Sequence, residues 1–179
     1  MHTHHLARIL IASLTAVGAG ALAIGAVAAS VESSQPAPKR ITRSGVDGVK
    51  LGMSHTQLRQ RGLVGRIRPG CELGGPNTRS ARLLPPLRGQ VNYTLRSPRR
   101  VRDITIRGGA RARGVGIGST IRAIRRAFPR ARVDHGTEDV FRLTLVRTPR
   151  RNGRRITFGV STTTKRTTVI GVPVIAFCE

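Results

Sequence analysis

The chain repeats part of its own sequence at a fixed spacing of 66 residues, and this repeat restricts the fold more than any other feature. Residues 48–54 read Gly-Val-Lys-Leu-Gly-Met-Ser, and residues 114–120 read Gly-Val-Gly-Ile-Gly-Ser-Thr. At the same spacing, residues 99–106 align with residues 165–172, each with two basic residues followed by alternating apolar positions. Matches near both ends of one ungapped alignment predict two tandem structural units.

A short helix is predicted near the start of each unit. Ser54 and Gln57 have the spacing of a capping box, so the first helix is expected to begin after Ser54. In the second unit, either Ser119 or Thr120 can cap a helix that Pro129 stops. Apolar residues recur there at helical spacing, at Ile121, Ile124 and Phe128.

Alternating apolar and polar residues follow each predicted helix, which is typical of half-buried antiparallel strands. The runs lie near residues 91–95, 102–106, 141–145, 156–160 and 169–177. Turn-forming residues such as Asn152-Gly153 separate them. The predicted fold class is therefore α+β, with two tandem pseudo-repeats at residues 45–109 and 110–179. Each is expected to be a short helix followed by an antiparallel β-meander of about three strands.

The N-terminal segment is predicted to direct export from the cytoplasm. Residues 9–31 contain no charged side chain, and Ala26-Val27-Ala28 has the small-x-small pattern that signal peptidases cleave. The apolar run is also just long enough to span a bilayer as one helix. Residues 1–29 are thus a signal peptide or an N-terminal membrane anchor, and the cleavage pattern favours removal. Residues 30–44, rich in Ser, Pro and basic side chains, are predicted to be a flexible linker.

Cys71 and Cys178 are the two cysteines of the sequence. Outside the reducing cytoplasm an even pair is expected to form a disulfide, which would tie the first unit to the C-terminal strand. The alternatives are a metal pair or a redox thiol. A structural zinc site needs four ligands, and the chain has no Cys-x-x-Cys, so the disulfide is favoured.

The chain carries a formal net charge of +24, almost entirely from arginine. Arginine binds phosphate and carboxylate groups in bidentate fashion, so an anionic partner is one interpretation. The other is that a GC-rich genome and a need for solubility set the composition, leaving solvated arginines in turns and helices. The candidate anion-binding residues are Arg99, Arg100, Arg102, Arg122, Arg125, Arg126, Arg150, Arg151, Arg154 and Arg155.

The scarcity of aromatic residues limits the choice of partner. The chain has no Trp, one Tyr and four Phe, so few side chains could stack on bases, and export also makes nucleic acid an unlikely target. Anionic lipid or a cell-wall polymer would offer the same salt-sensitive attraction in the right compartment. The alternative partner is another envelope protein, which the chain would serve as an inhibitor or adaptor.

No group of residues in the sequence has the pattern of an active site. There is no Gly-x-Ser-x-Gly elbow and no phosphate-binding loop ending in Gly-Lys-Ser/Thr. Outside the leader, only His55 and His135 remain as histidines, and Glu72 and Glu138 occupy equivalent repeat positions, which favours a structural role. No catalytic, cofactor or metal site is predicted. The expected function is an exported, non-enzymatic binding or structural module of the cell envelope, with an unrecognised hydrolase as the weakest hypothesis.

Residues 51–58, Leu-Gly-Met-Ser-His-Thr-Gln-Leu, resemble the Gly-Met-Thr-x-x-x-Val/Leu opening of a superfamily of small envelope proteins. This group includes outer-membrane assembly lipoproteins of the SmpA type and tandem-repeat β-lactamase inhibitor proteins. The resemblance implies two α/β repeats with helices against an antiparallel sheet, and a binding role. The aromatic-rich sheet of the inhibitors and the lipobox cysteine of the lipoproteins have no counterpart here, so the resemblance extends to architecture alone.

Overall fold

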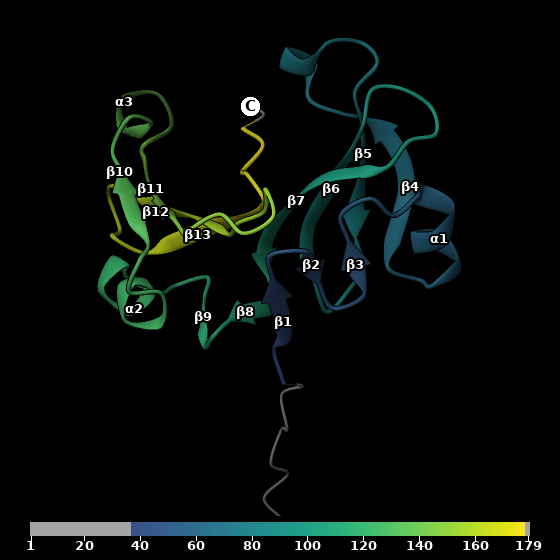
Figure 1. Cartoon of the computed structure of the whole chain (residues 1–179). Helices are drawn as coiled ribbons and strands as arrows, with labels where there is room; N and C mark the ends of the chain where they lie inside the picture. The colour runs from purple at the N-terminus through teal and green to yellow at the C-terminus, as the bar shows by residue number, and fades with distance from the viewer. Residues whose placement is uncertain (1–36, 178–179) are drawn as a thin grey trace, which may run out of the picture. The chain divides into compact units, whose positions relative to one another are not determined.

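The computed structural model describes residues 37–177 (Figure 1). The predicted leader, residues 30–36 of the predicted linker and Cys178 lie outside this range. Within it, no helix has the length and apolar character needed to cross a bilayer. The fold is mixed α/β, made mostly of strands in two sheets.

The larger sheet has eight antiparallel strands in the order β10-β11-β12-β13-β7-β6-β5-β4. The first half, residues 45–109, supplies β4 (Val64–Pro69), β5 (Arg79–Leu83), β6 (Arg88–Tyr93) and β7 (Val101–Gly108). The second half, residues 110–179, supplies β10 (Arg132–Asp134), β11 (Leu143–Arg147), β12 (Thr157–Ser161) and β13 (Thr167–Val172).

Each half therefore contributes four strands to this sheet, where about three were predicted. The sequence of β4, Val-Gly-Arg-Ile-Arg-Pro, lacks the alternation of apolar and polar residues that marks a strand. Four of its six residues are exposed, and one is proline. The strand β10 has three residues, which is too short to show a period of two.

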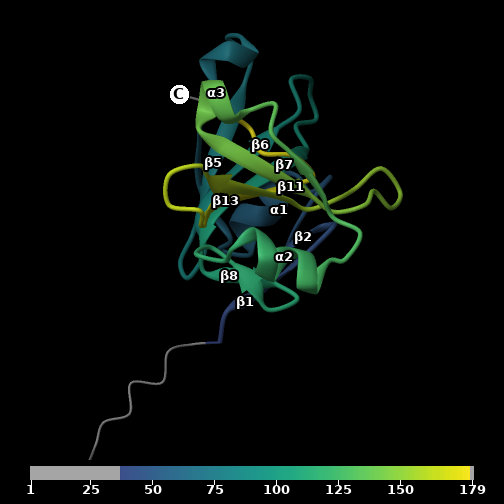
Figure 2. The same cartoon turned by 90° about the vertical axis from the view of Figure 1, so that its left-hand side faces the viewer.

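A smaller sheet has the order β3-β2-β1-β8-β9. Figure 2 labels three of its strands, β1, β2 and β8, below the labelled strands of the larger sheet. Its strands are β1 (Lys39–Thr42), β2 (Gly45–Val46), β3 (Val49–Lys50), β8 (Ala110–Ala112) and β9 (Val115–Gly116). The central strand β1 pairs with β8 in parallel and with β2 antiparallel. The prediction of a linker through residue 44 is wrong for this part of the chain. Ile41 is buried in the core, but basic and polar neighbours conceal this single apolar position.

The helices are α1 (His55–Gln60), α2 (Ile121–Ala127) and α3 (Glu138–Phe141), with one 3-10 turn, η1 (Glu72–Gly74). The predicted capping box is confirmed, because the Ser54 hydroxyl accepts from the Gln57 N–H and the Gln57 side chain accepts from the Ser54 N–H. Of the two cap candidates in the second half, Thr120 caps α2.

Several elements begin at the spacing of the sequence repeat. The pairs β3 and β9, α1 and α2, η1 and α3, and β7 and β13 each start 66 residues apart. Leu58 of α1 and Ile124 of α2 are separated by the same distance in sequence, and both are fully buried in the hydrophobic core.

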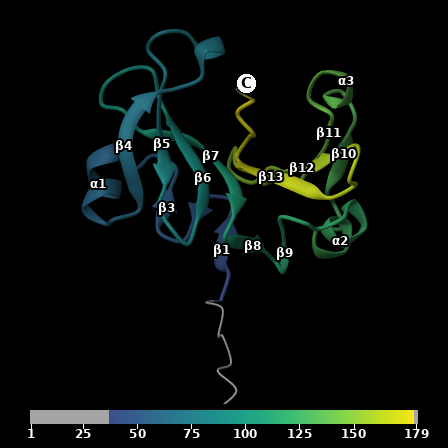
Figure 3. The same cartoon turned by 180° about the vertical axis from the view of Figure 1, so that it is seen from behind.

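The two halves meet where β7 pairs with β13, in the middle of the larger sheet (Figure 3). Thr105 lies opposite Gly171, with Ile104 opposite Val172 and Ile106 opposite Ile170 on either side. In the 66-residue alignment Ile104 corresponds to Ile170 and Ile106 to Val172. Exchanging the two strands therefore leaves the pairing unchanged, as at the interface of a symmetric dimer.

Candidate anion-binding site

The connection between β11 and β12, residues 148–156, forms a hairpin that carries four of the candidate arginines. Backbone hydrogen bonds join Arg151 and Arg154 in both directions, at 2.9 and 3.1 Å. Asn152 and Gly153 both have positive φ, at 51° and 72°, as a two-residue hairpin turn requires. The predicted turn at Asn152-Gly153 is thereby confirmed.

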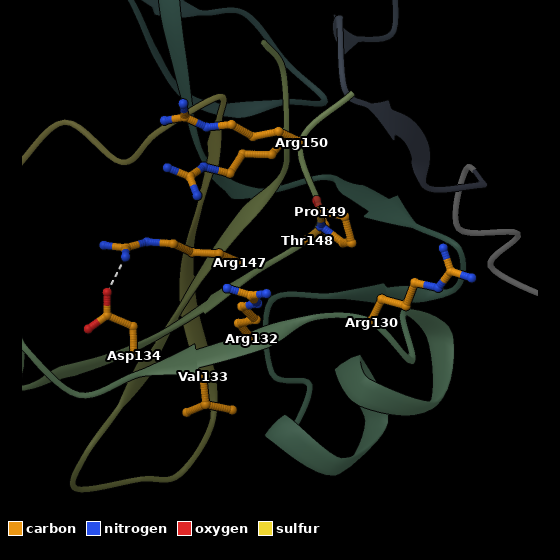
Figure 4. Close-up of a pocket in the computed structure, with 9 residues that line it drawn as sticks. Arg130, Arg132, Val133, Asp134, Arg147, Thr148, Pro149 and Arg150 are labelled. Carbon is orange, nitrogen blue, oxygen red and sulfur yellow. Dashed lines mark hydrogen bonds and ion pairs between the residues drawn. The ribbon is translucent and has the colours of Figure 1, made fainter. Parts of the chain in front are cut away.

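A groove of about 840 Å3 lies on one side of this hairpin, and we call it the arginine groove (Figure 4). Its charged lining combines Arg150 of the hairpin with Arg132 of β10 and Arg147 of β11. The other lining residues are Arg130, Val133, Asp134, Thr148, Pro149 and Arg155. Five arginines and a single carboxylate thus contribute to the lining, and Figure 4 shows the guanidinium group of Arg130 pointing away from those of Arg147 and Arg150.

The carboxylate does not neutralise the groove. Asp134 forms a salt bridge and hydrogen bond with Arg147. Arg132 lies directly opposite Arg147 in the β10–β11 ladder, and like charges in that position are unfavourable. Burial lowers the pKa of the Arg155 guanidinium, and the charges of Arg150 and Arg147 lower this pKa further. The groove therefore holds positive charges that repel one another and that an anion would stabilise.

The remaining predicted arginines lie elsewhere. Arg122, Arg125 and Arg126 project from α2 and border a shallow, open depression beside Pro129. Arg151 and Arg154 line a pocket on the other side of the hairpin from the arginine groove.

Arg99, Arg100 and Arg102 are not brought together in a shared site. Arg99 donates to the carbonyl of Asn77 at 2.8 Å, and Arg100 reaches the carbonyl of Gly52 at 3.5 Å. Arg102 donates at 2.9 Å to Asp103, a buried carboxylate that also accepts a bond from Asn92. Each of these three side chains is thus held by a different acceptor.

Sequence reasoning missed Arg130 and Arg132 as site residues. Both follow the Pro129 stop signal of α2, in the order Pro-Arg-Ala-Arg. The register of β10 against β11 then sets Arg132 opposite Arg147. The basic residues after Pro129 were visible in the sequence, but the pairing of a three-residue strand was not.

Cys71 lies beside the C-terminal segment, residues 173–177. Its Sγ is 3.5 Å from the carbonyl oxygen of Phe177, the residue before Cys178. Phe177 stacks on Phe141 with ring centroids 4.1 Å apart, and Ile175 packs in a small cluster with Leu145 and Val169. The predicted disulfide involves a residue outside the described range and remains a prediction, but the chain approaches Cys71 at the required point.

The titratable groups outside the groove occupy separate places. His55 bonds to the carbonyl of Gly65 at 3.1 Å and packs edge-on against Tyr93, whose pKa burial raises to about 12. His135 lies 2.6 Å from Glu138. Hydrogen bonds from Thr144 and then His135 lower the pKa of Glu138. Among residues 37–177, no three His, Cys, Asp or Glu side chains gather in a way that could hold a metal.

No known protein family, curated protein or solved structure matches this chain. The chemistry of the site is therefore the basis for inferring what the protein does.

Proposed function

We propose that this protein is an exported, non-enzymatic module of the cell envelope that binds an anionic polymer or lipid surface through the arginine groove. One observation carries the proposal: five arginines border the groove, while its one carboxylate is engaged by Arg147. The unbalanced positive charge favours a ligand with several negative groups over a ligand with one.

The geometry of arginine supports phosphate or carboxylate groups as the bound chemistry. A guanidinium presents a planar fork of N–H donors that matches two oxygens of one such group. The groove volume, about 840 Å3, exceeds what one phosphate would occupy and leaves room for several groups of a polymer or of neighbouring headgroups. Bound anions would also offset the repulsion among Arg147, Arg150 and Arg155.

We further propose that the chain arose from two tandem units. The common 66-residue spacing of four pairs of elements and the exchangeable pairing of β7 with β13 support this history. Two α/β units with helices against an antiparallel sheet are also what the resemblance to the envelope-protein superfamily implies. On this view the repeated framework supplies stability, and the hairpin at residues 148–156 supplies the binding chemistry.

Retention on anionic vesicles and on cell-wall fragments, measured as salt is raised, tests the proposal. We expect Arg150→Gln/Arg155→Gln to weaken retention at least tenfold and to lower the salt slope by about one per arginine removed. The control is Arg99→Gln/Arg100→Gln, which removes the same charge outside the groove and should change retention less than about twofold. Retention that ignores salt, or equal losses in both double variants, would rule out a specific role for the groove.

A further inference from the structure

A second pocket lies on the other side of the 148–156 hairpin, and four separate segments build it, three of which supply arginines. Arg40 and Arg43 come from β1 and the turn after it, and Arg113 comes from the turn between β8 and β9. Arg151 and Arg154 come from the hairpin. Among the described residues that line this pocket there is no carboxylate, so five positive charges meet without a neutralising partner.

Arg43 carries an unsatisfied donor in this pocket. Its Nε is buried from solvent and has no hydrogen-bond acceptor among residues 37–177. A buried N–H of a charged group without an acceptor is costly, because the group has lost its water and gained nothing in return. Because Nε is closed to solvent, a bound anion would first contact the other guanidinium N–H groups of the pocket and would reach Nε only after the Arg43 side chain shifts.

Arg113 is held in place before any ligand binds. It adopts a left-handed backbone conformation, with φ 48°, and its side chain donates to the carbonyl of Ala127 at 3.3 Å. Its guanidinium carbon lies 5.2 Å from the centroid of the Phe128 ring, within cation–π range. The paired backbone bonds of the hairpin fix the backbone at Arg151 and Arg154, whose side chains are exposed. Arg113 would therefore lose little conformational entropy when an anion binds.

The floor of the pocket is apolar, and its rim is charged. Ile41, Phe128 and Ile156 line it and are each no more than 6% exposed. Low polarity beneath the guanidinium groups strengthens their attraction for an anion. The pocket measures about 350 Å3, at the small end of ligand sites, and so suits one phosphorylated group better than a length of polymer.

We propose that this pocket, which we name the phosphate pocket, is a second and independent site that binds the phosphate group of a small ester or of an anionic phospholipid. The site does not depend on the arginine groove. Its place in the chain favours a lipid source, because Arg40 and Arg43 lie within the segment predicted to connect the leader to the first unit.

Calorimetric titration of the exported protein with inorganic pyrophosphate at low salt tests the site. We expect Arg43→Gln/Arg113→Gln to bind at least tenfold more weakly than the unsubstituted protein. Arg99→Gln/Arg100→Gln removes equal charge outside both cavities and should change affinity less than about twofold. Equal losses in both double variants, or no detectable binding by the unsubstituted protein, would overturn the proposal.

A second variant covers the case in which Arg43→Gln/Arg113→Gln does not fold, which circular dichroism would reveal. Arg154→Gln changes an exposed side chain at the rim of the same pocket and should weaken pyrophosphate binding about threefold or more. Unchanged affinity in a folded Arg154→Gln protein would count against the site.

Vesicles distinguish the two sources of the phosphate. The probe is phosphatidylglycerol in phosphatidylcholine vesicles, with and without competing pyrophosphate. If the ligand is a lipid headgroup, pyrophosphate should displace the protein and Arg43→Gln/Arg113→Gln should reduce co-sedimentation. If the ligand is a soluble ester, the same substitutions should abolish pyrophosphate binding and leave co-sedimentation unchanged. A failure confined to Arg150→Gln/Arg155→Gln would concern the arginine groove instead.

Discussion

Two hairpins at comparable places in the two halves differ sharply in chemistry. The β5–β6 connection of the first half reads Leu-Pro-Pro-Leu, and Leu87 is buried. The β11–β12 connection of the second half reads Thr-Pro-Arg-Arg-Asn-Gly-Arg-Arg-Ile and separates two arginine-lined cavities. A bias in genome composition acting alone would add arginines to both connections. The framework is therefore shared between the halves, and the two connections differ because four arginines lie in the second and none in the first.

The first half has a cavity of its own beside its hairpin, which makes the contrast informative. It measures about 590 Å3 and is bordered by Leu84, Pro85 and Leu87 together with three arginines. The three arginines beside the first hairpin come from its strands and from β7, whereas the longer second connection carries four arginines of its own.

The largest expected effect is the loss of stability when the predicted disulfide between the first half and the C-terminal segment is removed. Cys178→Ser should lower the free energy of unfolding by about 4 to 5 kcal/mol in the chain-entropy model, because Cys71 and Cys178 close a loop of about 100 residues. Guanidinium denaturation measures this loss, and reduction of the unsubstituted protein should reproduce it. Alkylation under non-reducing conditions followed by intact-mass measurement tests the bond directly. Labelling of both thiols would show that the disulfide is absent.

A smaller and symmetric effect is expected in the shared core. Leu58→Ala in α1 and Ile124→Ala in α2 should each cost about 2 to 5 kcal/mol, because both side chains are fully buried at equivalent places. Urea denaturation should show one transition for each variant if the halves unfold together. Val140→Ala, at a side chain that is 70% exposed, is the matched control and should change stability by less than about 0.5 kcal/mol. Two separate transitions would mean that the halves do not share one cooperative core.

The smallest effect distinguishes Glu138 from its first-half counterpart Glu72. Hydrogen bonds from Thr144 and His135 hold the pKa of Glu138 below its ordinary value of 4.5. A carboxyl whose pKa is lowered on folding stabilises the protein above the unfolded-state pKa, and this contribution is lost as the pH falls through the folded-state pKa. Between pH 6 and pH 3, the thermal midpoint of Glu138→Gln should therefore fall less than that of the unsubstituted protein. Glu72→Gln, at the equivalent and exposed position of the first half, is the matched control for the substitution itself.

The sequence predicted the parts of the fold that depend on local patterns. The capping box at Ser54, the turn at Asn152-Gly153 and the alternating strands β6, β7 and β12 all have short-range signals. The strands β1, β4 and β10 could not be found in this way, because basic side chains or short length removed the alternation that marks a strand. Long-range pairing alone makes these segments strands.

The candidate site was predictable in part for the same reason. Arg150, Arg151, Arg154 and Arg155 form a visible cluster along the chain. These four residues line two different cavities because their side chains lie on opposite sides of the hairpin. Arg43 and Arg113 line the same pocket because β1 pairs in parallel with β8. Sequence spacing contains neither fact.

The central position of β1 in the smaller sheet affects the order in which the chain can fold. This strand leaves the ribosome before every other element described, yet its parallel partner β8 follows about 70 residues later. Contacts so distant in sequence form slowly, because a long loop must close first. The pairing of β1 with β2 can form early, but the smaller sheet is completed only after residue 112 has been made. This late completion would favour the predicted export, because a chain that crosses a membrane through a translocation channel must still be unfolded.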